Sequence, residues 1–182
     1  GTEGGYINAF NPKTLTFKSY LVPNYRSPKQ GLWIRSINSL NKNELIIGTQ
    51  MGGYCKFNIV EEKFYPFPAI THDCLTIIKD SNDKIWTGTY QGVHSFKENQ
   101  TKSYFHSGYK QLVNQSAITL RLIGNEIWVG YVGQGIHIFN IKKDEFHREF
   151  SNSPENLNSL SSNFVNCIYQ DKKGRIWIGT QN

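Results

Sequence analysis

The sequence has few residues with reactive or metal-binding side chains. It contains three Cys and five His among 182 residues, and no two Cys have the Cys-x-x-Cys spacing. Zinc sites and dithiol redox sites normally need that spacing, so we predict no metal and no cofactor. The odd Cys count also argues against a disulfide framework. We interpret Cys74 and Cys167 as small buried apolar residues because each lies in an apolar run, and the pairing state of all three, Cys55 included, stays open.

Long apolar segments are also missing. No run approaches the roughly 18 residues that a membrane span requires. The chain begins at Gly1, without Met and without a basic-then-apolar signal segment. Apolar residues make up 38% and charged residues 19%, which excludes a disordered chain. We therefore expect one soluble folded segment, of about one domain, that is processed or cut from something larger.

Helical patterning is absent, and aromatic residues and glycine are abundant instead. No segment keeps a helical spacing of apolar residues over about ten positions. Aromatic residues make up 14% of the chain, and there are 16 Gly. This composition favours strands and tight turns.

A pentapeptide that ends in Gly followed by Thr or Tyr recurs along the chain. Its copies are residues 45–49, 85–89, 127–131 and 176–180, and Gly1-Thr2 matches the end of a fifth copy. Successive pattern glycines are 47, 40, 42 and 49 residues apart. A period of about 44 residues is typical of propellers and other repeat folds.

Each unit around the pentapeptide contains four short strand-like stretches joined by Gly, Asn and Asp turns. Four antiparallel strands at this period are typical of a β-propeller blade. We predict an all-β partial propeller over residues 1–182. Its complete blades cover about 32–67, 73–106 and 116–150, and a split blade combines 164–180 with 4–20.

The split blade leaves three outcomes open. The chain could close on itself as four blades, dimerise so that each copy completes the other, or stay an open arc with exposed edges. A four-bladed ring bends sharply and would compress the side chains between blades. We therefore favour dimerisation or an arc.

The aromatic and glycine positions of the pentapeptide have a packing interpretation. Strand residues alternate between faces, so Trp86, Trp128 and Trp177 point the same way from their blades, and Ile46 takes this place in the first copy. We expect these side chains to fill the wedge between neighbouring sheets. The pattern Gly permits close approach of the neighbouring backbone.

No set of residues indicates catalysis. Asp80 and Asp171 occupy the same place in two units, which indicates turn hydrogen bonding. His72, Asp73 and Cys74 form the one cluster with reactive groups, but adjacent strand residues face opposite ways, and we interpret Cys74 as buried packing. His94 and His137 occupy equivalent strand positions, which suggests a shared packing position.

The net charge of +6 comes with Lys residues that fall mostly in turns. They form no basic stripe with interleaved aromatics, so we do not expect nucleic-acid binding. A ligand would instead meet the loops that precede the first strand and follow the second strand of each blade. Flat aromatic rings beside polar groups suit sugars. The candidates are Tyr25, Arg26, Trp33, His72, Asp73, Tyr90, Tyr109 and Tyr131.

One unit resembles a known family closely. Ser159-Leu160-Ser161-Ser162-Asn163-Phe164-Val165, followed by Ile168-Tyr169-Gln170-Asp171 and Gly174-Arg175-Ile176-Trp177-Ile178-Gly179-Thr180, is similar to the two-component regulator propeller repeat. The copy that ends at Thr89 shares Ile77, Asp80 and the pentapeptide but lacks the Ser-Leu-Ser lead. The units around Gly48 and Gly130 are more divergent, and the resemblance covers all four units.

This resemblance implies a location and a role. Such repeats form the periplasmic sensor region of hybrid two-component histidine kinases, common in gut Bacteroidetes and anchored in the inner membrane. Members respond to oligosaccharides released from glycans and signal as dimers. For this chain it implies a non-catalytic sensor segment with an oligosaccharide ligand and self-association. The alternatives are a protein-interaction scaffold and, with less support from the residues, a propeller lyase or glycosidase.

Overall fold

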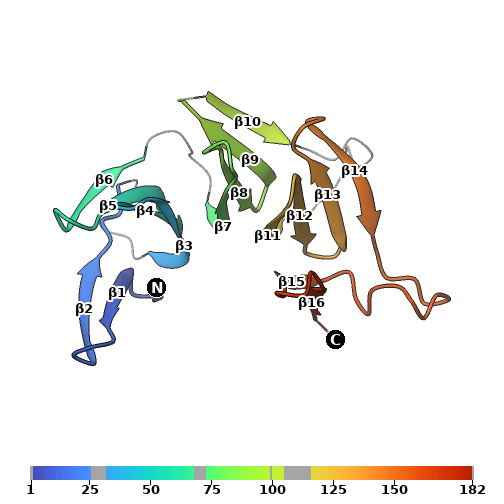
Figure 1. Ribbon diagram of the computed structural model, residues 1–182, viewed down its shortest axis with the longest axis horizontal. Coiled ribbons are helices and arrows are strands. Elements are labelled where there is room, and N and C mark those ends of the chain that lie inside the picture. Colours follow the sequence, from blue (N-terminus) through green and yellow to red (C-terminus); the bar gives the residue numbers. More distant parts are fainter. Residues whose placement is uncertain (1, 26–31, 68–72, 99, 105–115, 182) are drawn as a thin grey trace.

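The computed structural model describes residues 2–25, 32–67, 73–98, 100–104 and 116–181. Every regular element in these ranges is a β-strand, and the sheets stand side by side as an open arc (Figure 1). Strands β3, β7, β11 and β15 lie toward the inside of the arc, and the two chain ends lie at its opposite ends. The predicted all-β propeller architecture is confirmed. The described residues contain no helix that could span a membrane.

Three sheets have four antiparallel strands in sequential order. We call them blades 1, 2 and 3. Blade 1 contains β3 (Trp33–Asn41), β4 (Glu44–Gln50), β5 (Gly53–Asn58) and β6 (Lys63–Pro66). Blade 2 contains β7 (Cys74–Lys79), β8 (Ile85–Thr89), β9 (Gly92–Lys97) and β10 (Gln100–Tyr104). Blade 3 contains β11 (Ala117–Ile123), β12 (Glu126–Tyr131), β13 (Ile136–Asn140) and β14 (Glu145–Phe150).

Two further sheets have two strands each and terminate the arc. The N-terminal half-blade consists of β1 (Tyr6–Asn11) and β2 (Thr16–Leu21). The C-terminal half-blade consists of β15 (Val165–Gln170) and β16 (Ile176–Thr180). They form separate sheets in this chain. Their union into one split blade stays a prediction.

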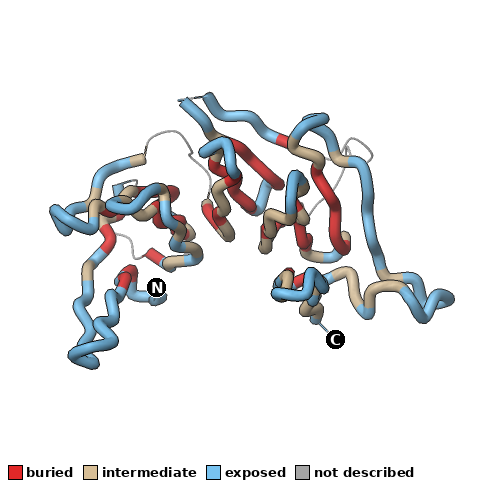
Figure 2. Tube along the Cα trace, in the orientation of Figure 1, coloured by how far each residue is buried: buried red, intermediate tan, exposed pale blue. Residues whose placement is uncertain are grey.

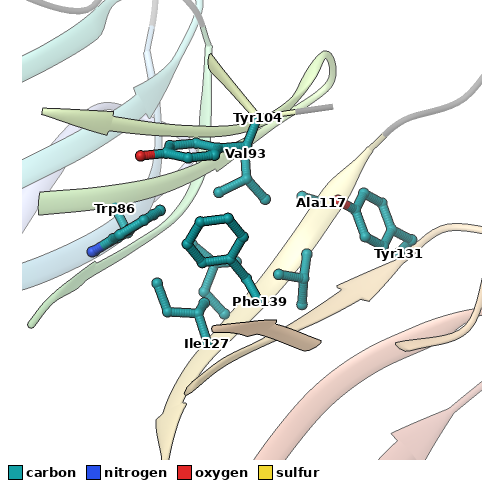
Figure 3. Close-up of a cluster of buried hydrophobic side chains, with 9 residues drawn as sticks. Trp86, Val93, Tyr104, Ala117, Ile127, Tyr131 and Phe139 are labelled. Carbon is teal, nitrogen blue, oxygen red and sulfur yellow. The ribbon is translucent and has the colours of Figure 1, made fainter. Parts of the chain in front are cut away.

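The core lies between blades, where one sheet face packs against the next. The largest of these clusters, which we call the Trp86 cluster, joins blades 2 and 3, and Figure 3 shows Phe139 of blade 3 inserted beside Trp86 of blade 2. The two ring centroids are 5.1 Å apart. Buried residues concentrate in the middle strands of the blades, whereas β2 and β14 are largely exposed (Figure 2). The cluster comprises Trp86, Val93, Tyr104, Ala117, Leu120, Ile127, Val129, Tyr131 and Phe139.

The wedge role predicted for the pentapeptide aromatic is confirmed where a following blade is complete. Trp86 is 0% exposed and Ile46 is 1% exposed, each against the next blade. Trp128 is half-buried because only a half-blade follows it. Trp177 is 55% exposed because no strand of the described chain covers its face.

The close approach predicted at the pentapeptide glycine is also confirmed. A Cβ added to Gly48 would lie 2.1 Å from the Sγ of Cys74 in the next blade. One added to Gly88 would lie 2.2 Å from the backbone oxygen of Ala117, again in the next blade. Any side chain at these positions would force neighbouring blades apart.

The turn role of Asp80 and Asp171 is confirmed, and each carboxylate has an additional partner. Asp80 Oδ1 accepts hydrogen bonds from the backbone N–H groups of Asn82 (2.8 Å) and Lys84 (3.1 Å). Its Oδ2 accepts one from the indole of Trp86 at 2.8 Å. Asp171 repeats the indole bond with Trp177 at 3.0 Å. The carboxylate therefore ties the first turn of the blade to the wedge tryptophan.

One sequence prediction about burial is wrong. Cys74 is buried as expected, but Cys167 is exposed. Cys167 pairs with Gly179 across β15 and β16, on the sheet face opposite to Ile168 and Ile178, which pack toward blade 3. No described strand covers the Cys167 face, so an apolar run in the sequence did not produce burial.

Removing the wedge side chain tests the inter-blade core. We expect Trp86→Ala to lower the free energy of unfolding by about 3–5 kcal/mol, because it leaves a cavity between two blades. Trp33→Ala, at a Trp that is 40% exposed, should cost about 1 kcal/mol. Urea denaturation followed by circular dichroism measures both, and equal losses in the two variants would contradict the wedge role.

The glycine contact predicts a second stability difference. Gly88→Ala is expected to destabilise the chain by about 1–3 kcal/mol because the new methyl group meets the backbone of blade 3. Gly4→Ala is the matched control, since its nearest neighbour would lie 3.7 Å away, at ordinary contact distance. Thermal unfolding of both variants measures the difference, and a neutral Gly88→Ala would show that the blades are not in close contact there.

Candidate functional site

The beginnings of the first strands and the ends of the second strands meet at one end of each blade. The pairs Trp33 with Gln50, Cys74 with Thr89, and Ala117 with Tyr131 lie there. We call this side of the arc the loop end. It carries the turns that the sequence analysis singled out as the ligand-facing side.

An aromatic and a cation lie together at the loop end of blade 1. Trp33 is 40% exposed, and the guanidinium of Arg35 lies 5.1 Å from the centroid of its ring. Arg35 Nε donates a hydrogen bond to Gln50 Oε1 at 2.9 Å, and Nη2 contacts the same oxygen. The amide oxygen therefore holds the guanidinium beside the ring, where a cation–π contact adds to it. This arrangement places a partly exposed aromatic residue next to hydrogen-bond donors.

Asp73 links two blades at the same end. Its Oδ1 accepts a hydrogen bond from the backbone N–H of Met51 at 2.9 Å. Met51 lies in the turn after β4, and Asp73 directly precedes β7. This hydrogen bond therefore fixes the start of blade 2 relative to the turn of blade 1.

The predicted tyrosines differ in their accessibility. Tyr25 and Tyr90 are 43% and 46% exposed. Tyr131 belongs to the Trp86 cluster and is 3% exposed, with its ring 5.0 Å from that of His137. Burial raises the pKa of the Tyr131 hydroxyl. Tyr131 therefore offers no surface for stacking, whereas the other two rings do.

Three of the predicted ligand residues, Arg26, His72 and Tyr109, lie outside the described residues. The remaining accessible candidates are Tyr25, Trp33, Asp73 and Tyr90. Trp33 and Asp73 lie at adjacent blades of the loop end. A role of any of them in ligand binding stays a prediction.

Burial removes the thiols of blades 1 and 2 from nucleophilic chemistry. Desolvation raises the pKa of Cys55 to about 12 and also raises that of Cys74. A nucleophilic Cys needs the opposite shift. His94 and His137 are each 1% exposed, and their rings bond within their own blades, to Ser103 and to the Gln134 carbonyl. Their predicted shared packing position is confirmed.

A cavity that the sequence analysis did not predict lies between blade 3 and the C-terminal half-blade. It has a volume of about 690 Å³ and opens beside Trp128 and Phe150. Their rings stack at a centroid distance of 5.9 Å. Ile176 and Ile178 of β16 line another side, with polar residues of the segment 151–159. Among the described residues, the sheet of β16 contains only β15 and β16, so this cavity borders a sheet of two strands.

Comparisons with known proteins agree with this geometry. The family model for the two-component regulator propeller matches residues 159–182. A histidine kinase P4 from Formosa agariphila is 35% identical over 160 residues, which are 82% of this chain and 12% of that protein. This chain therefore spans a small part of the curated relative's length.

Solved structures show the same architecture. The extracellular domain of a putative hybrid two-component system from B. thetaiotaomicron matches 98% of this chain with 25% identity and a TM-score of 0.72, over 23% of its own length. A second such domain from the same organism matches 95% of this chain with 21% identity and a TM-score of 0.74, also over 23% of its length. The radial blades, the wedge residues and these matches define a partial β-propeller.

The particular class of propeller follows from the repeat. The Asp171 turn, the Trp177 indole bond and the Gly179 contact lie in the segment that the family model matches. Residues 159–182 therefore form a two-component regulator propeller repeat.

Thiol labelling tests the assignment of the cysteines. We expect iodoacetamide to modify Cys167 in the native chain, while Cys55 and Cys74 react only after denaturation, because burial keeps their thiols protonated and covered. Peptide mass spectrometry locates the label. Labelling of Cys74 at the rate of Cys167 would contradict its place in the inter-blade core.

Proposed function

We propose that this chain is a non-catalytic, extracytoplasmic sensor segment of a hybrid two-component signalling protein. In this proposal the loop end of the arc binds an oligosaccharide derived from a glycan. The bound ligand then biases the arrangement of the blades, and the parent protein passes the change to a histidine kinase. The parent protein is anchored in the inner membrane.

The arrangement around Trp33 carries this proposal. A sugar ring offers an apolar face and a rim of hydroxyl groups, and the exposed Trp33 ring lies beside the donors of Arg35. Similarity to extracellular domains of hybrid two-component systems supports the location and the sensor role. The buried thiols support a binding role over a catalytic one.

The loop end also offers a route by which binding could be sensed. The hydrogen bond from Met51 N–H to Asp73 crosses from blade 1 to blade 2. Gln50, which orients Arg35, directly precedes Met51. A ligand that draws Arg35 toward its hydroxyl groups would therefore act on the turn that joins the two blades. If the turn has two arrangements and the ligand binds one of them more tightly, ligand binding shifts the equilibrium toward that arrangement.

Thermal-shift screening against a panel of defined oligosaccharides tests the proposal. A ligand that binds the native state raises the melting temperature, by an amount that grows with its concentration above the dissociation constant. We expect at least one neutral or acidic oligosaccharide to do so. Trp33→Ala should weaken its binding by about tenfold or more, since it removes the stacking surface.

Tyr65→Ala is the matched control, because Tyr65 is 39% exposed but lies on the outer strand β6. It should leave oligosaccharide affinity unchanged. No shift from any oligosaccharide, or equal loss in both variants, would contradict binding at the loop end. Cleavage of an oligosaccharide by the pure chain, detected by mass spectrometry, would contradict the non-catalytic role.

A further inference from the structure

The first strands β3, β7, β11 and β15 each contain a register shift at the same place. There one residue of the first strand is skipped in the pairing, opposite the last two residues of the pentapeptide. Two residues against one is the pattern of a β-bulge, which bends the strand and redirects the extra side chain. The bulge is therefore a place where the blades can differ in chemistry while they keep the same fold. The extra residues are Arg35, Leu75, Ile118 and Asn166.

Among these four bulge residues only Arg35, in blade 1, carries a charge. Arg35 is exposed, yet two neighbours hold its side chain at the loop end. The guanidinium lies 5.1 Å from the ring centroid of Trp33, which precedes it by two residues. Gln50 Oε1, at the end of β4, accepts a hydrogen bond from Nε at 2.9 Å and also contacts Nη2. The bulged side chain is thus placed beside the partly exposed tryptophan by specific contacts.

The group that holds Arg35 is uncharged. Gln50 orients the guanidinium through an amide oxygen and leaves its charge in place, and no carboxylate among the described residues pairs with Arg35. Lys56 and Arg175, by contrast, each form an ion pair with a carboxylate. Asp73 lies at the same end, but its carboxylate accepts the backbone N–H of Met51. Arg35 therefore keeps its positive charge beside Trp33.

The contact with Gln50 uses one edge of the guanidinium and leaves a second edge open. A guanidinium carries five N–H groups in a planar fork. The amide oxygen of Gln50 contacts the edge formed by Nε and Nη2, and no described residue places an acceptor on the edge formed by Nη1 and Nη2. Two parallel N–H groups match the paired oxygens of a carboxylate or a sulfate group. A single sugar hydroxyl fills only half of this edge.

The other first strands add positive charge and no negative charge. These strands lie toward the inside of the arc (Figure 1), and their charged residues are Arg35, Lys79 and Arg121, with no Asp or Glu. Arg121 also pairs with no carboxylate of the described chain, and its guanidinium lies 5.5 Å from the Tyr169 ring centroid. Surfaces lined by charges of one sign attract ligands of the opposite sign. The first strands therefore favour an anionic ligand.

The turn that carries Gln50 contains a strained residue. Met51, the next residue, has a φ of 75°, in the left-handed region that residues other than Gly rarely adopt. In the turn after β12 of blade 3, the left-handed residues are Gly133 and Gly135. Asp73 of blade 2 fixes the Met51 turn by accepting its N–H at 2.9 Å. Strained residues persist where their surroundings fix them, and they cluster at ligand-binding sites, so Met51 supports a positioning role for this turn.

We propose that Arg35 selects anionic oligosaccharides, in which a sugar carries a carboxylate or a sulfate group. This inference rests on the proposed function and narrows its ligand to one chemical class. The Nη1 and Nη2 edge of Arg35 donates two hydrogen bonds to the anionic group, and Trp33 contacts the ring of the same sugar. Gln50 is the positioning residue. A neutral sugar at this place would take water from the guanidinium without supplying a negative charge, which is unfavourable.

Oligosaccharide pairs that differ only in charge test this selectivity. The pairs are tetragalacturonate with its methyl ester, and a sulfated galactose tetrasaccharide with its unsulfated form, both added to the oligosaccharide panel. In each pair that binds, the anionic member should have a dissociation constant at least about tenfold lower, because charge-assisted hydrogen bonds are stronger than neutral ones. Isothermal titration calorimetry measures the constants. The first pair reports a preference for carboxylate and the second a preference for sulfate.

Two substitutions test the roles of Arg35 and Gln50 in binding the anionic member. Arg35→Gln removes the charge and should weaken binding about tenfold to a hundredfold. Gln50→Glu keeps an oxygen beside the guanidinium but neutralises it, so it should weaken binding at least about tenfold while the melting temperature without ligand stays the same or rises. A purely structural role of Gln50 predicts no such loss. Circular dichroism checks that both variants are folded.

Arg148→Gln is the matched control, because it removes the same charge from β14, an outer strand. It should leave the dissociation constants unchanged. Neutral members that bind as tightly as their anionic partners, unchanged affinity in Arg35→Gln and Gln50→Glu, or an equal loss in Arg148→Gln would overturn the anion selectivity and leave the proposed function intact. Absence of binding by every oligosaccharide, neutral or anionic, would instead contradict the proposed function itself.

Discussion

Contact between neighbouring sheets across a glycine is the interaction on which this fold depends. The pentapeptide glycine removes a side chain from the second strand, and the first strand of the next blade moves into the space. The residue two positions before it, Trp86 or Ile46, then fills the widening part of the wedge. The large wedge residue and the glycine two positions later together fix the angle between each sheet and the next. Repetition of this pair of positions converts a chain of hairpins into a curved array.

The same interaction explains why the ends of the arc differ from its middle. Trp86 is fully buried because blade 3 is complete, Trp128 is half-buried because a half-blade follows, and Trp177 is exposed. The ends thus retain residues that are shaped for packing and lack a described partner. The loop end is independent of this, since Trp33, Arg35 and Asp73 lie at the ends of strands whose blades are complete.

The blades and the wedge residues could be predicted from the sequence, because the residues that pack between blades recur at the same position of each repeat. The repeat period predicted the four-stranded blades. The recurrence of Gly and Trp at the same positions of the pentapeptide predicted the packing between blades. The Asp80 turn was predictable from its recurrence, but its bond to the Trp86 indole was not, because the six-residue separation becomes close only when the hairpin folds. Cys167 was misjudged because an apolar strand has two faces, and the sequence alone does not say which face a neighbour covers.

The candidate site was less predictable than the fold for a related reason. Loop residues were chosen for their chemistry, which does not distinguish a ring on the surface from one in the core. Tyr131 holds in its pentapeptide the position that Thr49 and Thr89 hold in theirs, yet its ring packs in the Trp86 cluster against His137. Trp33 begins its strand and stays accessible. Strand alternation distinguishes a buried ring such as Tyr131 from an accessible one such as Trp33 only when the sheet that packs against each face is known. The sequence alone does not give that packing.

Native-state hydrogen exchange tests the central role of the inter-blade contacts most directly. If those contacts hold the fold together, the slowest amides lie in β8, β9, β12 and β13, which flank the Trp86 cluster. Amides of the exposed outer strands β2 and β14 then exchange by smaller local openings. Slowest exchange in the outer strands, or blades 2 and 3 opening with unrelated free energies, would contradict the account.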